Sequence, residues 1–173
     1  RLLVWFGTLS GAKQFDWMIS AWQAVKASGI PVALVALGAS PALPSGIGSA
    51  GFVPLGHQPP DEVSCVLQIA DVVGLPFVDG VSERRGSFTA ALSHGCPVVG
   101  TLGSNTGPSL RASDDFVGVE SAFGREAFVA AVKQLFQSPT RCVRLRHRAK
   151  MIYASRYDWP VLMRRLEDAL FKS

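Results

Sequence analysis

Short apolar runs alternate with longer amphipathic segments along the chain, and this alternation constrains the fold more than any other feature. A strand followed by a helix, repeated several times, is typical of βα units around a mainly parallel sheet. Near-continuous Val and Leu content favours strands covered on both faces. The sequence therefore predicts an α/β fold with a doubly wound parallel sheet of about six strands. The expected strands are Leu2 to Phe6, Val32 to Leu37, Gly51 to Leu55, Asp71 to Phe77, Pro97 to Thr101 and Phe116 to Glu120.

Helices are predicted between the strands and throughout the C-terminal section. Apolar residues recur at helical spacing from Phe15 to Val25, which predicts a helix of about four turns after the first strand. Asp158 is expected to cap a last helix that carries Trp159, Leu162, Leu166 and Leu170 on one face. The other expected helices are Asp61 to Ile69, Ser87 to His94, Arg125 to Phe136 and Pro139 to Ala154. All 173 residues are assigned to one domain.

Composition narrows the class of protein further. The chain is 48% hydrophobic and 17% charged, which is typical of a soluble globular domain. Its longest apolar stretch, residues 30–38, is far shorter than the ~20 residues that a transmembrane helix needs. Three cysteines without C-x-x-C spacing predict neither a disulfide framework nor a zinc site, so we expect a reducing, cytoplasmic location. Because position 1 is not Met, we expect a fragment or a processed product.

Charge is distributed unevenly along the chain. Residues 140–173 hold nine Lys or Arg against three acids, whereas the first 139 residues hold eight against ten. A basic tail is compatible with nucleic acid, an anionic membrane surface or an acidic partner. No stacking aromatics interleave with the basic helix, so nucleic acid is not expected as a partner. Peripheral contact with the inner face of a membrane stays open.

Two loops are the expected ligand site. In a doubly wound sheet of strand order 3-2-1-4-5-6, ligands lie at the carboxyl ends of strands one and four. The loop after strand one contains Gly7, Gly11 and Lys13, which bring free backbone N–H groups and an ammonium to the start of a helix. On local evidence alone, a simple helix cap with a solvated lysine explains the same residues somewhat better.

The loop after strand four places Arg84 and Arg85 directly before another helix, with Gly86 and Ser87 at its start. Arginines oppose the positive end of the helix dipole unless an anion binds there, which favours a ligand role. The alternative is pairing with the nearby acids Asp79 and Glu83. The sequence does not choose between these two interpretations.

Three further features carry weaker signals. His57 follows the third strand, close to where a nucleobase would lie, but it has no partner for catalysis in the sequence. The segment from Gly103 to Gly107 follows strand five and is best explained as a turn, although it could approach a sugar hydroxyl or a phosphate. Acidic residues are scattered, so no metal site is predicted.

Several motifs together resemble the C-terminal, donor-binding half of the GT-B glycosyltransferases, specifically the large retaining group-one family. Gly7 to Lys13 is similar to the family's G-R-L-x-x-x-K segment. The A-D-V-x-x-x-P strand and the G-x-P-V-V strand are matched by residues 70–76 and 95–99. Residues 124–127 and 157–159 are similar to the start of the helix after the last strand and to the step before the closing helix. The resemblance implies a Rossmann-like domain and covers almost the whole chain.

The resemblance implies that Lys13 contacts the diphosphate of the donor. The arginine that precedes this lysine in the family is replaced by Thr8, and Arg84 and Arg85 could supply the missing cation. The family also has two glutamates, whose positions are occupied by Ser82 and Ala90 in this chain. Glu83 lies one residue away from the first position and could take over its role.

The implied function is transfer of a sugar from a nucleoside diphosphate sugar to an acceptor, with no cofactor. The partners would be that donor and an absent N-terminal GT-B domain, to which the closing helix 159–171 would cross. A nucleotide-sugar epimerase and a non-catalytic binding module remain as alternatives. The expected catalytic residues are Lys13, Glu83, Arg84 and Arg85, and the expected donor-binding residues are Gly7, Thr8, His57, Ser82, Gly86 and Ser87.

Overall fold

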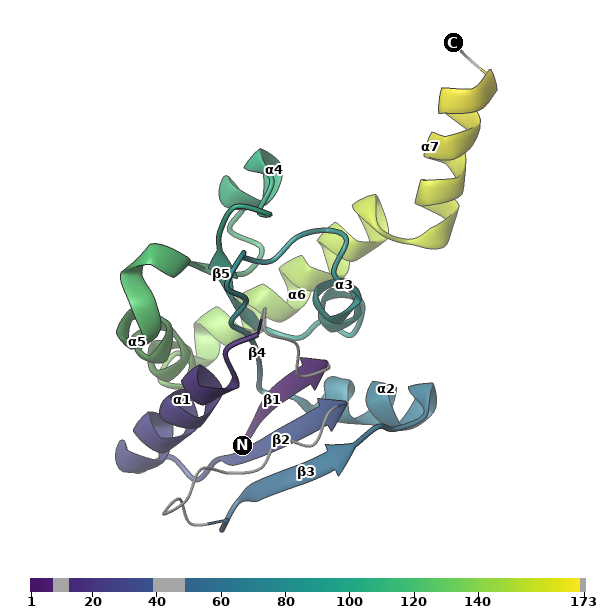
Figure 1. The fold of residues 1–173 in the computed structure, drawn as a ribbon. Coiled ribbons are helices and arrows are strands. Elements are labelled where there is room, and N and C mark those ends of the chain that lie inside the picture. Colours follow the sequence, from purple (N-terminus) through teal and green to yellow (C-terminus); the bar gives the residue numbers. More distant parts are fainter. Residues whose placement is uncertain (8–12, 39–48, 172–173) are drawn as a thin grey trace.

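A single parallel sheet forms the centre of the molecule (Figure 1). The structure is a computed structural model and describes residues 1–7, 13–38 and 49–171. The strand order is β3-β2-β1-β4-β5-β6, and every neighbouring pair is parallel, as the sequence predicts. The strands are β1 (Leu2–Gly7), β2 (Ala33–Gly38), β3 (Phe52–Gly56), β4 (Val72–Leu75), β5 (Val98–Leu102) and β6 (Val117–Glu120).

The helices follow the strands in the predicted order. They are α1 (Phe15–Ala27), α2 (Pro60–Ile69), α3 (Gly86–Ser93), α4 (Pro108–Arg111), α5 (Gly124–Phe136), α6 (Pro139–Arg156) and α7 (Trp159–Phe171), with a 3-10 turn at Ser121–Phe123. The one-turn helix α4 was not predicted, because a four-residue element carries no periodic signal. The predicted strand Asp71 to Phe77 is shorter in the structure, since Pro76 cannot donate a hydrogen bond to a neighbouring strand.

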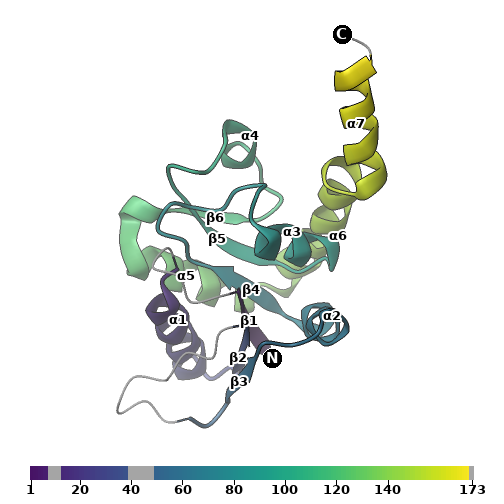
Figure 2. The ribbon, with the colours of Figure 1, turned by 45° about the vertical axis from the view of Figure 1, so that its right-hand side comes forward.

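Helices cover both faces of the sheet, which is the doubly wound arrangement (Figure 2). On one face α1 and α5 pack around Trp5, Trp22 and Phe128, all almost fully buried. On the other face α2, α3 and α6 pack around Phe77 and Phe88. Burial of these large side chains, together with the aliphatic residues around them, stabilises both layers against the sheet.

The last helix leaves the body of the protein. In Figure 1, α7 projects away from the sheet and adjoins the rest of the chain at α6. None of its described side chains is buried, and Trp159, Leu166 and Phe171 are between half and four-fifths exposed. The predicted apolar face therefore exists on a helix but is uncovered. Within the described residues, no helix is both long enough and apolar enough to cross a membrane.

Two leucines on the C-terminal helices make a matched test of this difference. Leu145 on α6 is 2% exposed, whereas Leu166 on α7 is 51% exposed. Leu145→Ala is expected to lower the free energy of unfolding by about 2–4 kcal/mol, because it leaves a cavity in the core. Leu166→Ala is expected to lower it by less than about 0.5 kcal/mol. Urea denaturation measures both, and equal losses would show that the face of α7 is covered in solution.

Candidate functional site

The loops that follow β1 and β4 meet at the carboxyl edge of the sheet. The backbone N–H of Gln14 donates to the carbonyl of Pro76 at 2.9 Å, and Lys13 forms an isolated antiparallel bridge with Phe77. These contacts confirm that the two loops lie together where the winding of the sheet reverses. Thr8 and Gly11, also assigned to the first loop, lie outside the described residues.

Lys13 holds a half-buried ammonium between aromatic rings. Its Nζ lies 5.4 Å from the ring centroid of Trp5 and 5.3 Å from that of Phe77, and 3.5 Å from the carbonyl oxygen of Phe6. Burial, with a smaller contribution from the charge of Arg85, lowers the pKa of Lys13 from 10.5 to about 8. The simple solvated lysine that the sequence allowed is therefore not what forms.

Gly7 makes room for this ammonium. Its φ is +134°, and a Cβ placed on it would overlap Nζ of Lys13. An L-amino acid with a side chain would therefore be strained at position 7 and would displace Lys13 as well. Glycine is needed here for the conformation of the backbone and for the space above it.

Arg85 lies beside Lys13 and is held by three contacts. Its guanidinium pairs with the carboxylate of Asp79, its Nε donates to the carbonyl of Gly80 at 3.1 Å, and it stacks 3.9 Å from the ring centroid of Phe77. Of the two interpretations that the sequence left open, the structure therefore shows the ion pair with Asp79. The guanidinium has five N–H donors, so it keeps others for a ligand.

Arg84 differs from its neighbour. Its side chain is exposed, and no ion pair or hydrogen bond joins it to another described residue. It precedes α3, which begins at Gly86 and has no side-chain cap on its first N–H groups. An unpaired cation and uncapped N–H groups at one helix start favour an anion at this position.

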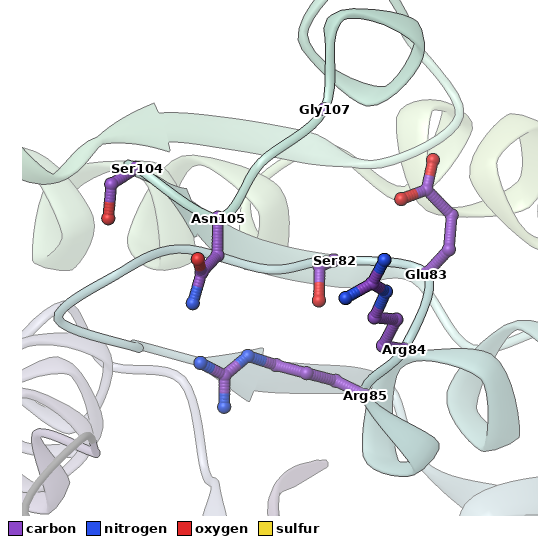
Figure 3. Close-up of a pocket in the computed structure, with 7 residues that line it drawn as sticks. All are labelled: Ser82, Glu83, Arg84, Arg85, Ser104, Asn105 and Gly107. Carbon is purple, nitrogen blue, oxygen red and sulfur yellow. The ribbon is translucent and has the colours of Figure 1, made fainter.

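A third loop, between β5 and α4, completes a pocket of about 530 Å³. The pocket is lined by Ser82, Glu83, Arg84, Arg85, Ser104, Asn105 and Gly107. In Figure 3 the guanidinium of Arg85 and the amide of Asn105 point toward each other across it. The sequence favoured a plain turn for residues 103–107, so Ser104 and Asn105 were missed. Their position in the chain could have indicated them, because they follow β5, which lies next to β4 in the sheet.

The remaining predicted residues are placed as follows. Ser82 and Glu83 line the pocket, whereas Gly86 and Ser87 form the first turn of α3 and do not line it. His57 is exposed after the edge strand β3 and does not line the pocket either. Among the described residues, no group of three or more His, Cys, Asp or Glu side chains could hold a metal ion.

Ala90 occupies the position of the second family glutamate. It lies on α3, packs against the core beneath that helix and does not line the pocket. The acid that does reach the pocket is Glu83, whose side chain extends toward Gly107 in Figure 3. The structure therefore brings together Lys13, Glu83, Arg84 and Arg85 at one end of the sheet.

Several solved structures share this fold. The chain superposes on WaaG, a glycosyltransferase involved in lipopolysaccharide biosynthesis, with a TM-score of 0.74 and 17% identity over 99% of this chain and 47% of that one. HepE of Anabaena in complex with UDP and glucose gives a TM-score of 0.73 and 15% identity over 99% and 48%. Sucrose-phosphate synthase of Thermosynechococcus elongatus gives 0.76 and 16% over 99% and 45%.

The fold is thus the Rossmann-like unit of GT-B glycosyltransferases, as the motifs predicted. The family model "Glycosyl transferases group 1" matches residues 1–138, and the chain belongs to this family. No curated protein sequence matches it. The chain spans about half the length of the solved structures that it resembles.

The close approach of Gly7 and Lys13 gives a test that needs no ligand. Gly7→Ala is expected to lower the free energy of unfolding by about 1–3 kcal/mol through backbone strain. It should also push the ammonium of Lys13 toward water, so that its pKa rises from about 8 toward 10.5. Thermal unfolding and NMR titration of the lysine measure the two effects.

Gly29→Ala is the matched control for this substitution. Gly29 has a φ of +82°, but a Cβ placed there would meet nothing within 4 Å. The control should share the backbone strain and leave the pKa of Lys13 unchanged. An unchanged lysine pKa in Gly7→Ala would contradict the assignment of Gly7 as the residue that makes room for the ammonium.

Proposed function

We propose that this chain is the donor-binding domain of a glycosyltransferase that moves a sugar from a nucleoside diphosphate sugar to an acceptor. The observation that carries the proposal is the meeting of Lys13 and Arg85 over Phe77 at the reversal point of the sheet, next to an unpaired Arg84. Membership of the group 1 family supports the reaction class. The complex of HepE with UDP supports a nucleotide-sugar donor.

The proposed ligand is a diphosphate, because its charge matches what the loops present. Two cations held close together repel each other until an anion enters between them. The pKa of Lys13 is lowered mainly by burial and also by this repulsion from Arg85. The uncapped N–H groups at the start of α3 add donors for phosphate oxygens. Lys13, Arg84 and Arg85 would thus stabilise the charge that develops on the leaving nucleoside diphosphate.

Glu83 is proposed to act toward the sugar side of the donor. Its carboxylate is exposed in the pocket, on the side of Gly107, and it is an acid next to a position that holds a glutamate in the family. A carboxylate there can accept hydrogen bonds from sugar or ribose hydroxyls. Ser82, which occupies the family position itself, offers a hydroxyl to the same pocket.

The acceptor side belongs to the rest of such an enzyme. We propose that a second domain supplies it and that turnover requires both domains, because this chain covers about half of each solved structure that it resembles. A donor site without the two family glutamates favours a second candidate, a module that binds the nucleotide but has lost the transfer reaction. Assay of the full-length protein for sugar transfer separates the two candidates.

The direct test is calorimetric titration of this chain with UDP, GDP and ADP. One nucleotide is expected to bind, and Lys13→Ala and Arg84→Ala should each weaken its binding about tenfold or more, since each removes a charge-assisted contact. Arg144→Ala is the control, because Arg144 is an exposed cation on α6 outside the pocket. Absence of binding by all three nucleotides would contradict the proposal.

The pKa of Lys13 adds a pH dependence. The protonated form binds the diphosphate, so binding is full below the pKa and is lost as the pH rises through about 8. The dissociation constant of the bound nucleotide is expected to increase about tenfold between pH 7 and 9, with uptake of a proton on binding. Lys13→Ala should bind weakly at both pH values, and an equal pH dependence in this variant would assign the titration to another group.

A further inference from the structure

Asp79 connects two of the loops that form the pocket. One carboxylate oxygen pairs with the guanidinium of Arg85, and the other accepts a hydrogen bond from the side-chain amide of Asn105. The backbone carbonyl of Asp79 also accepts from the N–H of Asn105 at 2.8 Å. Asp79 itself does not line the pocket. Its carboxylate is therefore engaged by the groups around the ligand site and is not directed at a ligand.

The backbone around Asp79 is fixed as firmly as its side chain. A Cβ on Gly80 would overlap both Gly103 and Thr106, and a Cβ on Gly103 would press into the backbone of Asp79. The buried hydroxyl of Thr106 donates to the carbonyl of Val81 at 2.8 Å. The loops after β4 and β5 therefore form one packed unit, and a shift of Asp79 would move both.

Arg85 needs a fixed partner because it lies next to another cation. Its charge contributes to the lowered pKa of Lys13, so the two groups repel each other in the absence of a ligand. Stacking on Phe77 and the bond to Gly80 hold the side chain along its length, and the carboxylate of Asp79 compensates its charge. Without that carboxylate, a flexible arginine would turn toward water.

We propose that Asp79 is a positioning residue of the donor site, which holds Arg85 beside Lys13 and fixes the Asn105 loop against it before the diphosphate arrives. The inference rests on the proposed function. It assigns a role in binding to an acid that carries the wrong charge for a diphosphate. It also explains why Arg85 can be paired within the protein and still serve a ligand, since a prearranged donor loses less entropy on binding.

The direction in which Asp79→Asn changes the affinity for an anion distinguishes a positioning role from a purely electrostatic one. If Asp79 only adds negative charge near the site, Asp79→Asn should tighten the binding of an anion. If Asp79 positions Arg85, the same substitution should weaken binding, because the guanidinium is no longer held. An asparagine has nearly the same shape as aspartate, so the packing of the two loops is little changed.

The experiment is calorimetric titration of this chain with inorganic pyrophosphate and with UDP. Asp79→Asn is expected to weaken both about tenfold, which is the lower end of the loss seen when a supporting hydrogen-bond partner is removed at metal sites. In the Arg85→Gln background, Asp79→Asn should add less than about twofold, because Arg85 is gone and the Asn105 loop keeps its backbone hydrogen bond to the carbonyl of residue 79. Asp115→Asn is the matched control, since Asp115 also pairs with an arginine, Arg148 at 3.1 Å, and lies outside the pocket.

Each outcome decides a different point. Wild-type protein that binds neither pyrophosphate nor any of the three nucleotides would overturn the proposed function and this inference with it. Wild-type binding with equal or tighter binding by Asp79→Asn, or an equal loss in the Arg85→Gln background, would overturn this inference alone. Circular dichroism verifies folding. Should Asp79→Asn not fold, Asp79→Glu keeps the charge and moves the carboxylate, and wild-type affinity in that variant would overturn the positioning role.

Discussion

The central position of β1 in the parallel sheet is the constraint on which the site depends. β1 pairs with β2 on one side and with β4 on the other. From β1 the chain adds β2 and β3 in one direction, and from β4 it adds β5 and β6 in the other. Parallel pairing places the carboxyl ends of β1 and β4 side by side, and the loops that leave them must diverge to opposite faces. At this edge the ring of Phe77 contacts the charged groups of both Lys13 and Arg85.

A cluster of cations at this edge has an electrostatic cost, and the structure shows how it is limited. Lys13 is half-buried against aromatic rings, where its charged form is less favourable, and its pKa is lowered accordingly. Arg85 is compensated by Asp79, whereas Arg84 is exposed to water. The same arrangement leaves the positive charge of Arg84 and Arg85 at the pocket, beside the uncapped start of α3.

The structure shows where the residues at and near the two family glutamate positions lie. Ala90 occupies the second glutamate position and packs against the core. No other residue of α3 is an acid that could replace this glutamate. Glu83 and Ser82 line the pocket from the preceding loop, and Asn105 lines it from the loop after β5. The polar groups of this pocket therefore come from two loops that are joined through the carboxylate of Asp79. The site departs from the family pattern in its acids and retains its lysine.

Local patterns determined the elements and their order. Apolar runs, helical spacing and the positions of glycine and proline placed the six strands and the main helices to within a few residues, because these signals act over short distances in the chain. Gly7 and Lys13 could be placed at the carboxyl edge of the sheet for the same reason, since strand ends and helix starts are local features. The missed helix α4 and the shortened β4 were elements of only four residues each.

Only the tertiary structure decided which charges pair and which groups share a pocket. Asp79 and Asn105 are 26 residues apart in sequence, and their contact exists because β4 and β5 are neighbours in the sheet. The sequence offered Arg85 either an anion or an acid as partner, and these alternatives differ by distances of a few ångströms that no local pattern encodes. The lowered pKa of Lys13 likewise requires burial, which arises only when Trp5 and Phe77 close around it.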